Sequence, residues 1–257
     1  MTKRREVVAG MAALPLFGLG SGFWAGARAR EGALEGDAVP TEDGDIIIHP
    51  VDHASLVLGF GDAVVYVDPV GGAARYQGLP APTAILVTHE HGDHYDAPTL
   101  EAIAGNAPLI VNPAVYDMLP EALKANATAM ANGDTGVVTG FPIKAVPAHN
   151  TTPDRMQYHP VDRDNGYVLT LGGRQVYIAG DTEPTPEMLD LTDIEVAFLP
   201  MNLPYTMAPE QAAEAINTFK PKIAYPYHYG DSDLSVLEAA VGPDTEIRLR
   251  EWYPSGG

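Results

Sequence analysis

A short segment, residues 88–96, restricts what this chain can fold into more than any other part of the sequence. It places four potential metal ligands within six residues: His89, His91, Asp93 and His94. The apolar run 84–87 directly before it is typical of a buried strand, and a strand ending in a tight loop can direct all four side chains at one point. Neutral imidazole and carboxylate suit divalent zinc, iron or manganese. The segment therefore predicts a metal site at the end of a strand.

Length, cysteine content and charge limit the fold and the partners. The chain has 257 residues, enough for one large α/β domain with a buried core. It has no cysteine, which excludes disulfides and leaves only nitrogen and oxygen donors for a metal. The formal net charge of -19 opposes nonspecific contact with nucleic acid or anionic lipid, because like charges repel. We therefore expect a small-molecule substrate and no nucleic-acid partner; the sequence does not predict an oligomeric state.

The first 29 residues resemble a twin-arginine signal peptide. The pair Arg4-Arg5 precedes an apolar run over residues 7–27, and Ala27-Arg28-Ala29 supplies a small-x-small cleavage site. Such a signal predicts export of the folded protein to the periplasm. The alternative is an uncleaved anchor, but Pro15 and the glycines of the run weaken a spanning helix. We expect cleavage, no stable membrane insertion afterwards, and a flexible leader over residues 30–44.

The order of the predicted elements indicates an α/β fold for residues 45–257. Short strands dominate the first part, and strands alternate with helices in the last third. We expect strands at 46–48, 55–58, 63–67, 84–87, 109–111, 137–138, 143–146, 167–171, 175–178, 196–199, 223–225 and 246–249. We expect helices at 98–104, 113–123, 184–190, 209–219 and 233–240. Two mixed sheets in the middle with helices outside, a four-layer αββα sandwich, satisfy this order.

Three further candidate ligands each follow a predicted strand. They are His149, Asp181 and His228. A lone histidine after a strand is more often a surface or capping residue, but the preceding His-x-His-x-Asp-His loop reverses that expectation. The i, i+2 spacing of His89 and His91 allows both to bind one ion, while Asp93 and His94 are displaced enough to serve a second.

Taken together, these residues resemble the metallo-β-lactamase superfamily. The resemblance covers about residues 45–250. Smaller features resemble the branch that contains L-ascorbate-6-phosphate lactonase-like and other metal-dependent hydrolases. They are His53-Ala54-Ser55, Asp68-Pro69, Asn165-Gly166 and Tyr225-Pro226-Tyr227-His228-Tyr229.

The resemblance implies two divalent metal ions, with Zn²⁺ favoured and Mn²⁺ or Fe²⁺ as alternatives. It implies that His89, His91 and His149 bind the first ion. Asp93, His94 and His228 bind the second, and Asp181 bridges both. Water activated between the ions is then the nucleophile, and Asp93 belongs to the catalytic machinery. Asp181 stands where antibiotic-hydrolysing members use cysteine, which argues against true β-lactamase activity.

Other residues near these positions have two interpretations each. His53 is a catalytic or substrate-contacting candidate by the resemblance, and otherwise a histidine bonded within the sheet. Tyr205 is a candidate proton donor to a leaving group, although a tyrosine there more often packs. Asp68 orients a ligating imidazole or simply precedes Pro69 in a turn. The loop 151–164 forms a lid or contacts an anion, or is merely solvated.

The sequence thus predicts a metal-dependent hydrolase acting on a small lactone, ester or phosphodiester, with lactone favoured through the resemblance alone. An iron-dependent redox enzyme on the same fold is one alternative, since nitrogen and oxygen ligands also suit iron. A non-catalytic metal-binding module is another, which the complete ligand set opposes.

Overall fold

The computed structural model describes residues 34–254 of the chain. The expected signal segment, residues 1–29, lies outside the described residues, as does the start of the expected leader. Within the described range, no helix combines the length and the apolar character needed to cross a membrane.

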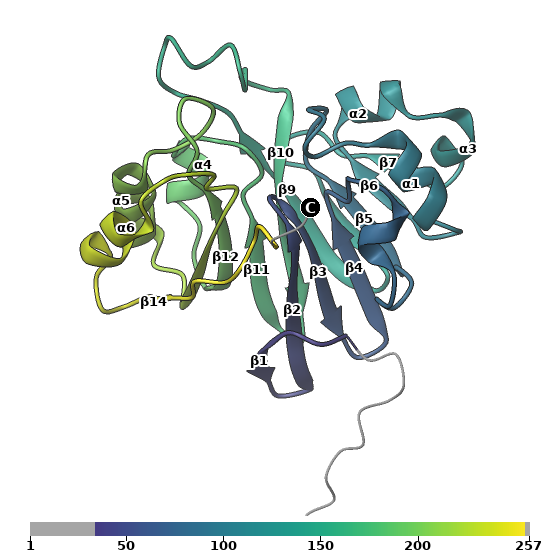
Figure 1. Cartoon of the computed structure of the whole chain (residues 1–257), viewed down its shortest axis with the longest axis horizontal. Helices are drawn as coiled ribbons and strands as arrows, with labels where there is room; N and C mark the ends of the chain where they lie inside the picture. Colours follow the sequence, from purple (N-terminus) through teal and green to yellow (C-terminus); the bar gives the residue numbers. More distant parts are fainter. Residues whose placement is uncertain (1–33, 255–257) are drawn as a thin grey trace, which may run out of the picture. The chain divides into compact units, whose positions relative to one another are not determined.

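Two seven-stranded sheets form the centre of the described domain (Figure 1). The first sheet contains, in spatial order, β1 (Asp37–Thr41), β2 (Gly44–Asp52), β3 (Ser55–Phe60), β4 (Ala63–Val67), β5 (Ala84–Val87), β6 (Leu109–Val111) and β7 (Ala127–Ala129). The second contains β14 (Glu246–Ile247), β13 (Ile223–Tyr227), β12 (Ile194–Pro200), β11 (Arg174–Ile178), β10 (Asp164–Leu171), β9 (Phe141–Ala148) and β8 (Thr135–Val138). In both sheets the strands that come first in the sequence pair antiparallel and the later ones parallel. The two halves therefore repeat one plan.

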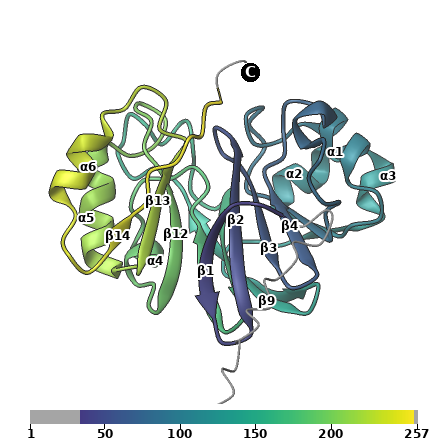
Figure 2. The same ribbon diagram turned by 60° about the horizontal axis from the view of Figure 1, so that its bottom comes forward.

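Helices connect the parallel strands and lie outside the sheets (Figures 1 and 2). Beside the first sheet lie the short 3₁₀ helix η1 (Ala73–Tyr76), α1 (Ala97–Ile103), α2 (Pro113–Met118) and α3 (Glu121–Lys124). Beside the second lie α4 (Pro186–Leu189), α5 (Pro209–Phe219) and α6 (Leu234–Ala240). Parallel strands need such crossovers, because a tight turn joins only antiparallel neighbours.

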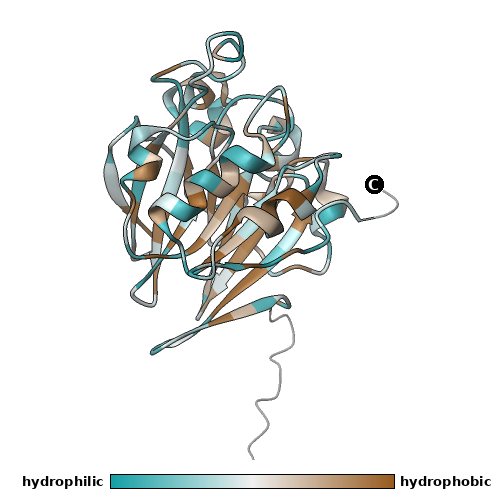
Figure 3. Ribbon diagram, turned by 90° about the vertical axis from the view of Figure 1, so that its left-hand side faces the viewer, coloured by the Kyte–Doolittle hydropathy of each residue, from teal (hydrophilic) through white to brown (hydrophobic). Residues whose placement is uncertain are grey.

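Three hydrophobic clusters define four layers. One lies between the sheets and draws on both of them, as with Leu58 and Leu169. A second packs α4, α5 and α6 against the outer face of the second sheet, and a third packs α1 to α3 against the first. Figure 3 shows the hydrophobic residues concentrated along the strands. The predicted αββα sandwich of two mixed sheets is confirmed.

Local patterning explains which side each strand residue faces. In β2, Ile46 and Ile48 are fully buried, and both belong to the cluster between the sheets. In β5 every residue is buried, because Leu86 faces the other sheet while Ile85 faces the helices. A parallel strand covered on both faces must be apolar throughout, which is why 84–87 is an unbroken apolar run.

The structure corrects the sequence-based boundaries in two places. The flexible leader expected to reach residue 44 is instead ordered from Asp37, because β1 pairs with β2 and buries Val39. The single helix expected at 113–123 is divided into α2 and α3 at Leu119-Pro120, since the residue before a proline disfavours helical backbone.

The two sheets are tied together where the candidate ligands gather. The backbone N–H of Asn165 in β10 donates to the carbonyl of Thr88, just beyond β5, at 3.1 Å. The hydroxyl of Tyr167 donates to the carbonyl of Val87 at 2.9 Å. Gly166 lies between these two residues, and a Cβ there would approach the carbonyl oxygen of Ala179 at 2.6 Å. Only glycine lets β10 lie this close to the end of β11, its neighbour in the second sheet.

We predict that Gly166→Ala destabilises the domain by about 1–3 kcal/mol, the usual cost of overpacking, because the obstacle is backbone that cannot move aside. Urea unfolding followed by circular dichroism measures the change. Gly136→Ala is the matched control in a strand, since its Cβ would meet nothing closer than 3.8 Å. Equal stability of the two variants would contradict the close approach at Gly166.

Candidate metal centre

The histidine loop is held in shape at both ends. It follows β5 and turns where the N–H groups of His94 and Tyr95 both donate to the carbonyl of His91. It ends at Asp96, whose side chain accepts from the N–H of Thr99 and caps α1. The strand before the loop and the helix after it thus fix the loop. Its histidine and aspartate side chains point toward the ends of neighbouring strands.

The first group of potential ligands contains His89, His91 and His159. Nε2 of His89 lies 3.2 Å from Nδ1 of His91, and the ring centres of His91 and His159 are 4.8 Å apart. Two nitrogens bound to one tetrahedral ion at about 2.0–2.1 Å are about 3.3 Å apart. The observed nitrogen separation therefore fits two ligands of one ion.

The remaining potential ligands form two further groups, one of which shares His89 with the first. Nε2 of His228 lies 3.3 Å from Oδ2 of Asp93, and Nε2 of His53 lies at the same distance from that oxygen. His89, His94 and Asp181 form the other group. All these separations again match the spacing of ligands around one ion.

Asp181 connects the groups through its two carboxylate oxygens. Oδ1 lies 3.3 Å from Nε2 of His94. Oδ2 lies 3.2 Å from Nε2 of His228, 3.5 Å from Nε2 of His159 and 3.9 Å from Nε2 of His89. Gly180 before it has φ +65°, and a Cβ there would come within 2.8 Å of the carbonyl oxygen of Asn165. The Gly-Asp order thus lets the chain turn sharply and deliver the carboxylate to the centre.

Left-handed backbone at three positions turns side chains toward the site. His53, Asp68 and His228 have φ values of 48°, 44° and 47°. Histidine and aspartate are among the non-glycine residues that enter this region most readily, and such conformations concentrate at functional sites. The N–H of His228 donates to the carbonyl of His53 at 3.0 Å, so the two turns support each other across the sheets.

Most of the imidazoles are oriented by a second partner at Nδ1. Asp68 lies 2.8 Å from Nδ1 of His94, and Asp164 lies 2.9 Å from Nδ1 of His159. Thr88 Oγ1 lies 3.0 Å from Nδ1 of His89, and the hydroxyl of Tyr253 lies 3.0 Å from Nδ1 of His53. A carboxylate at Nδ1 must receive the ring proton, which leaves the Nε2 lone pair directed at the centre, as metal binding requires.

The electrostatics of the cluster favour a cation at its centre. Burial raises the pKa of Asp181, but the charges of His228 and His94 outweigh it and hold the pKa well below its ordinary value. Burial lowers the pKa of His94, yet Asp181 and Asp68 raise it well above the usual range. Burial, with His94 nearby, lowers the pKa of His89 well below normal. Asp181 is therefore ionised, and its buried negative charge favours a cation beside it.

The donor set fits divalent metal ions. Nε2 of His94 and Oδ1 of Asp181 are buried and have no hydrogen-bond partner, although they face each other. Buried polar atoms without a partner are rare, and a metal ion placed between them would satisfy both. Six imidazoles and two carboxylates, with no sulfur, suit zinc, iron or manganese.

Comparisons with known proteins agree with this geometry. Residues 64–229 match the family model described as the beta-lactamase superfamily domain. A UPF0173 metal-dependent hydrolase from Thermococcus onnurineus is 31% identical over 212 residues, which covers 76% of this chain and 92% of that protein. This chain belongs to the UPF0173 metal-dependent hydrolase family of the metallo-β-lactamase superfamily.

Solved structures support the assignment of this chain to the metal-dependent hydrolases. A metal-dependent hydrolase from Parabacteroides distasonis is 44% identical, with a TM-score of 0.78 and coverage of 85% of this chain and 99% of that one. Igni18, a metallo hydrolase from Ignicoccus hospitalis, is 23% identical with a TM-score of 0.66, covers 80% of this chain and 95% of its own, and shows the fold alone.

The structure brings six of the seven sequence-predicted ligands together but not His149. The six are His89, His91, Asp93, His94, Asp181 and His228, and His159 takes the position expected for the seventh. The expectation for His149 is therefore corrected. The backbone explains the exchange: the carbonyl of His149 accepts from the N–H of Glu183, while the N–H of Asn150 donates to the carbonyl of His159. The two ends of the loop 150–159 are thus joined, and His159 lies beside the end of the strand that His149 follows.

A buried glutamate that sequence reasoning missed anchors this loop. Glu183 accepts hydrogen bonds from the N–H groups of Thr151 and Thr152 and forms an ion pair with Arg155. Its side chain is fully buried, and these bonds keep its pKa lowered although burial alone would raise it. The sequence feature that could have identified Glu183 is its position directly after Gly180-Asp181-Thr182. The feature that could have identified His159 as a ligand is Asp164, a carboxylate five residues later that lies at Nδ1 of its ring.

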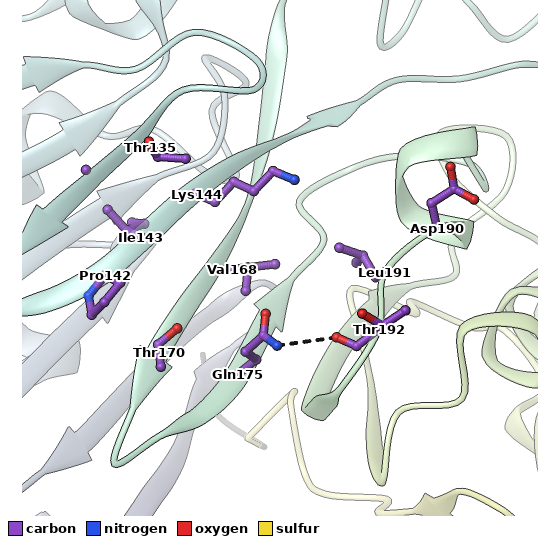
Figure 4. Close-up of a pocket in the computed structure, with 11 residues that line it drawn as sticks. Thr135, Pro142, Ile143, Lys144, Val168, Thr170, Gln175, Asp190, Leu191 and Thr192 are labelled. Carbon is purple, nitrogen blue, oxygen red and sulfur yellow. Dashed lines mark hydrogen bonds between the residues drawn. The ribbon is translucent and has the colours of Figure 1, made fainter.

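A cavity of about 490 Å³ lies over the cluster. It is lined by His53, His91, Asp93, Tyr158, His159, Asp181, Asn202, Tyr205 and His228. The candidates His53 and Tyr205 thus share one cavity with the predicted ligands. Another cavity, of about 320 Å³, lies beside β8 to β11 and α4 (Figure 4). It shares no lining residue with the first and contains no histidine, so the candidate metal centre belongs to the first cavity.

We predict that His159→Ala lowers metal affinity by more than about 100-fold, since losing a ligand costs more than losing an outer partner, whereas His149→Ala leaves affinity unchanged. Competition with a chelator, read by elemental analysis, measures both, and circular dichroism controls for folding. The opposite ranking of the two variants would restore His149 as the ligand.

Proposed function

We propose that this hydrolase binds two divalent cations, Zn²⁺ first, and cleaves small-molecule lactones, esters or phosphodiesters. The carrying observation is the carboxylate of Asp181, because its Oδ2 lies 3.2 Å from Nε2 of His228 and 3.5 Å from Nε2 of His159, so one oxygen lies between imidazoles of the two ligand sets. His89, His91 and His159 would hold one ion, and Asp93, His94 and His228 the other. When bound, such a pair lowers the pKa of water and polarises a carbonyl or phosphoryl oxygen.

Residues of the chain supply orientation and proton control. Burial raises the pKa of Asp93, but hydrogen bonds from His228 and His53 lower it, so the carboxylate is ionised. It is about half exposed at the cavity, and we assign it to accept a hydrogen bond from the attacking water molecule. His53 holds Asp93 in place through Nε2, while its own Nδ1 is fixed by Tyr253.

Tyr205 is assigned to donate a proton to the leaving oxygen. Its ring lines the cavity and is 45% exposed, so the hydroxyl reaches a substrate bound over the cluster. The carbonyl of Tyr205 accepts from Nδ2 of Asn150 at 2.7 Å, which fixes its backbone beside the loop that carries His159. The amide of Asn202 lies in the same cavity and is placed to orient a substrate oxygen.

The resemblance to the lactonase-like branch supports lactones within this proposal. A redox reaction on iron is the second candidate, because the donor set of nitrogen and oxygen alone suits iron as well as zinc. Elemental analysis of protein purified without added metal separates the two, since bound iron with substrate-dependent oxygen consumption supports the redox candidate.

The test is turnover by the metal-loaded enzyme on a panel of lactones, esters and phosphodiesters. We predict that Asp181→Ala abolishes hydrolysis, because one side chain serves both groups, while circular dichroism remains native. Glu195→Ala, at an exposed ion pair with Arg174, is the matched acidic control and should retain full activity. Near-normal rates for Asp181→Ala would remove the bridging role, and absence of turnover on the whole panel would contradict the hydrolase proposal.

We also propose that the hydrolase works in the periplasm, on the strength of Arg4-Arg5 and the apolar run after it. Changing the pair to Lys-Lys should retain the full-length protein inside the cell, because the export machinery reads the arginines. Fractionation of a bacterial host, with immunoblotting, measures this. Unchanged export of the Lys-Lys variant would contradict the twin-arginine assignment.

A further inference from the structure

We propose that the hydrolase is specific for uncharged substrates that carry an aromatic group, and that Tyr158 and Tyr205 form the subsite receiving this group. The proposal rests on the proposed hydrolytic function and narrows its substrate class from lactones, esters and phosphodiesters to neutral aromatic esters and lactones. We call the two residues the tyrosine subsite.

The two rings meet over the metal cluster although they come from distant segments. Tyr158 lies in the loop between β9 and β10, which extends beyond the sheets in Figure 1, and Tyr205 follows β12. Their ring centres are 5.0 Å apart at 74°, an edge-to-face contact, and both line the cavity. Because aromatic rings associate at centre distances of about 4.5–7 Å, a third ring can extend this pair.

Buried polar contacts hold the tyrosine subsite in position. Nη2 of Arg163 donates to the carbonyl of Tyr158 at 2.8 Å. Nδ2 of Asn150 donates to the carbonyl of Tyr205, and Nη1 of Arg155 donates to the carbonyl of Thr206 at 3.0 Å. The backbone behind both rings is therefore fixed before substrate arrives, which lowers the entropy lost on binding.

The cavity offers no side-chain cation to an anionic substrate. Among the described residues that line it there is no lysine or arginine, while Asp93 and Asp181 both line it. The arginines of the adjacent loop are already paired: Arg155 with Glu183, and Arg163 with Glu90 and Asp164. A charged group held away from the metal position would lose water without gaining a partner, which is unfavourable.

Exposed apolar side chains are concentrated on the segments that carry the tyrosine subsite. Four of the seven large hydrophobic residues exposed in the described chain lie on the two segments that carry the tyrosine subsite. They are Met156, Val161, Leu203 and Tyr205. Exposed apolar residues that share neighbouring segments, rather than being scattered singly, are typical of a binding surface. Both the charge and the apolar surroundings thus favour a neutral, aromatic ligand.

The reaction remains an ordinary hydrolysis. The oxygen of one water molecule bonds to the carbonyl carbon, and the bond from that carbon to the ester oxygen breaks. One proton of the water passes to the leaving oxygen, so a carboxylic acid and an alcohol are released, or a hydroxy acid from a lactone.

The test compares three ethyl esters that differ only at the far end of the acyl chain, so that the leaving group carries no ring and the leaving alkoxide needs a proton. Phenylbutyrate ends in a ring, hexanoate in an alkyl chain, and glutarate in a carboxylate. The common leaving group keeps their intrinsic reactivity similar. We expect kcat/KM for phenylbutyrate to exceed that for hexanoate about threefold to tenfold, and glutarate to be at least about tenfold poorer than hexanoate.

Variants separate the ring from the hydroxyl. Tyr158→Leu and Tyr205→Leu should each bring the phenylbutyrate-to-hexanoate ratio close to one. Tyr205→Phe should keep the ratio while lowering kcat on every ester, because it retains the ring and removes the proton donor. Val137→Ala, at an exposed apolar residue of β8 outside the cavity, is the matched control and should change neither quantity.

A binding measurement distinguishes failure of this inference from failure of the proposed function. Calorimetry with benzylacetone, a neutral aromatic ketone, should show binding to the wild type that weakens about threefold to tenfold in both Leu variants, with hexanone as the alkyl control. If no ester is hydrolysed but benzylacetone binds in this way, the hydrolytic proposal fails and the subsite stands. If esters are hydrolysed but glutarate is preferred, or the Leu variants keep the phenyl preference, the subsite is wrong and the hydrolase stands.

Discussion

The buried carboxylate of Asp181 is the group on which the rest of the site depends. It is almost fully removed from solvent, one of its oxygens has no hydrogen-bond partner, and histidines from three other segments surround it. Burying an ionised carboxylate costs several kcal/mol unless a positive charge compensates it. Divalent cations provide that charge with the nitrogen and oxygen donors present here, and a deprotonated carboxylate with neutral imidazoles is the state in which those donors bind metal. The folded chain thus presents a site that a metal ion would complete.

The scaffold places this carboxylate where several strands end together. Parallel strands β5, β11 and β13 finish at one edge, which is the usual place for a ligand site in α/β proteins. The two sheets are joined at that edge by the hydrogen bonds from Asn165 to Thr88 and from Tyr167 to Val87. Outer partners such as Asp68 and Asp164 then set the direction of the imidazoles. Strand ends, close packing and outer carboxylates are therefore parts of one arrangement that holds the metal ligands rigidly.

Much of this was predictable from sequence because the ligands follow apolar runs. The run 84–87 must be a strand buried on both faces, so the histidines after it had to lie at a sheet edge, and the same reasoning located Asp181 and His228. The same reasoning was wrong for His149, because strand periodicity does not predict the path of the loop that follows the strand. His159 reaches the cluster only because residues 150–159 close on themselves around Glu183. Strand β1 was missed for a related reason: its five residues include a proline and have little apolar alternation, and pairing with β2 decides its structure.

The most direct measurement is anomalous scattering from crystals of the protein grown with Zn²⁺ and measured at the zinc absorption edge. The account predicts two peaks about 3.5–4 Å apart, as in other two-metal sites. One should lie among His89, His91 and His159, the other among Asp93, His94 and His228, with Asp181 touching both. A peak outside these groups, or none at full zinc saturation, would contradict it.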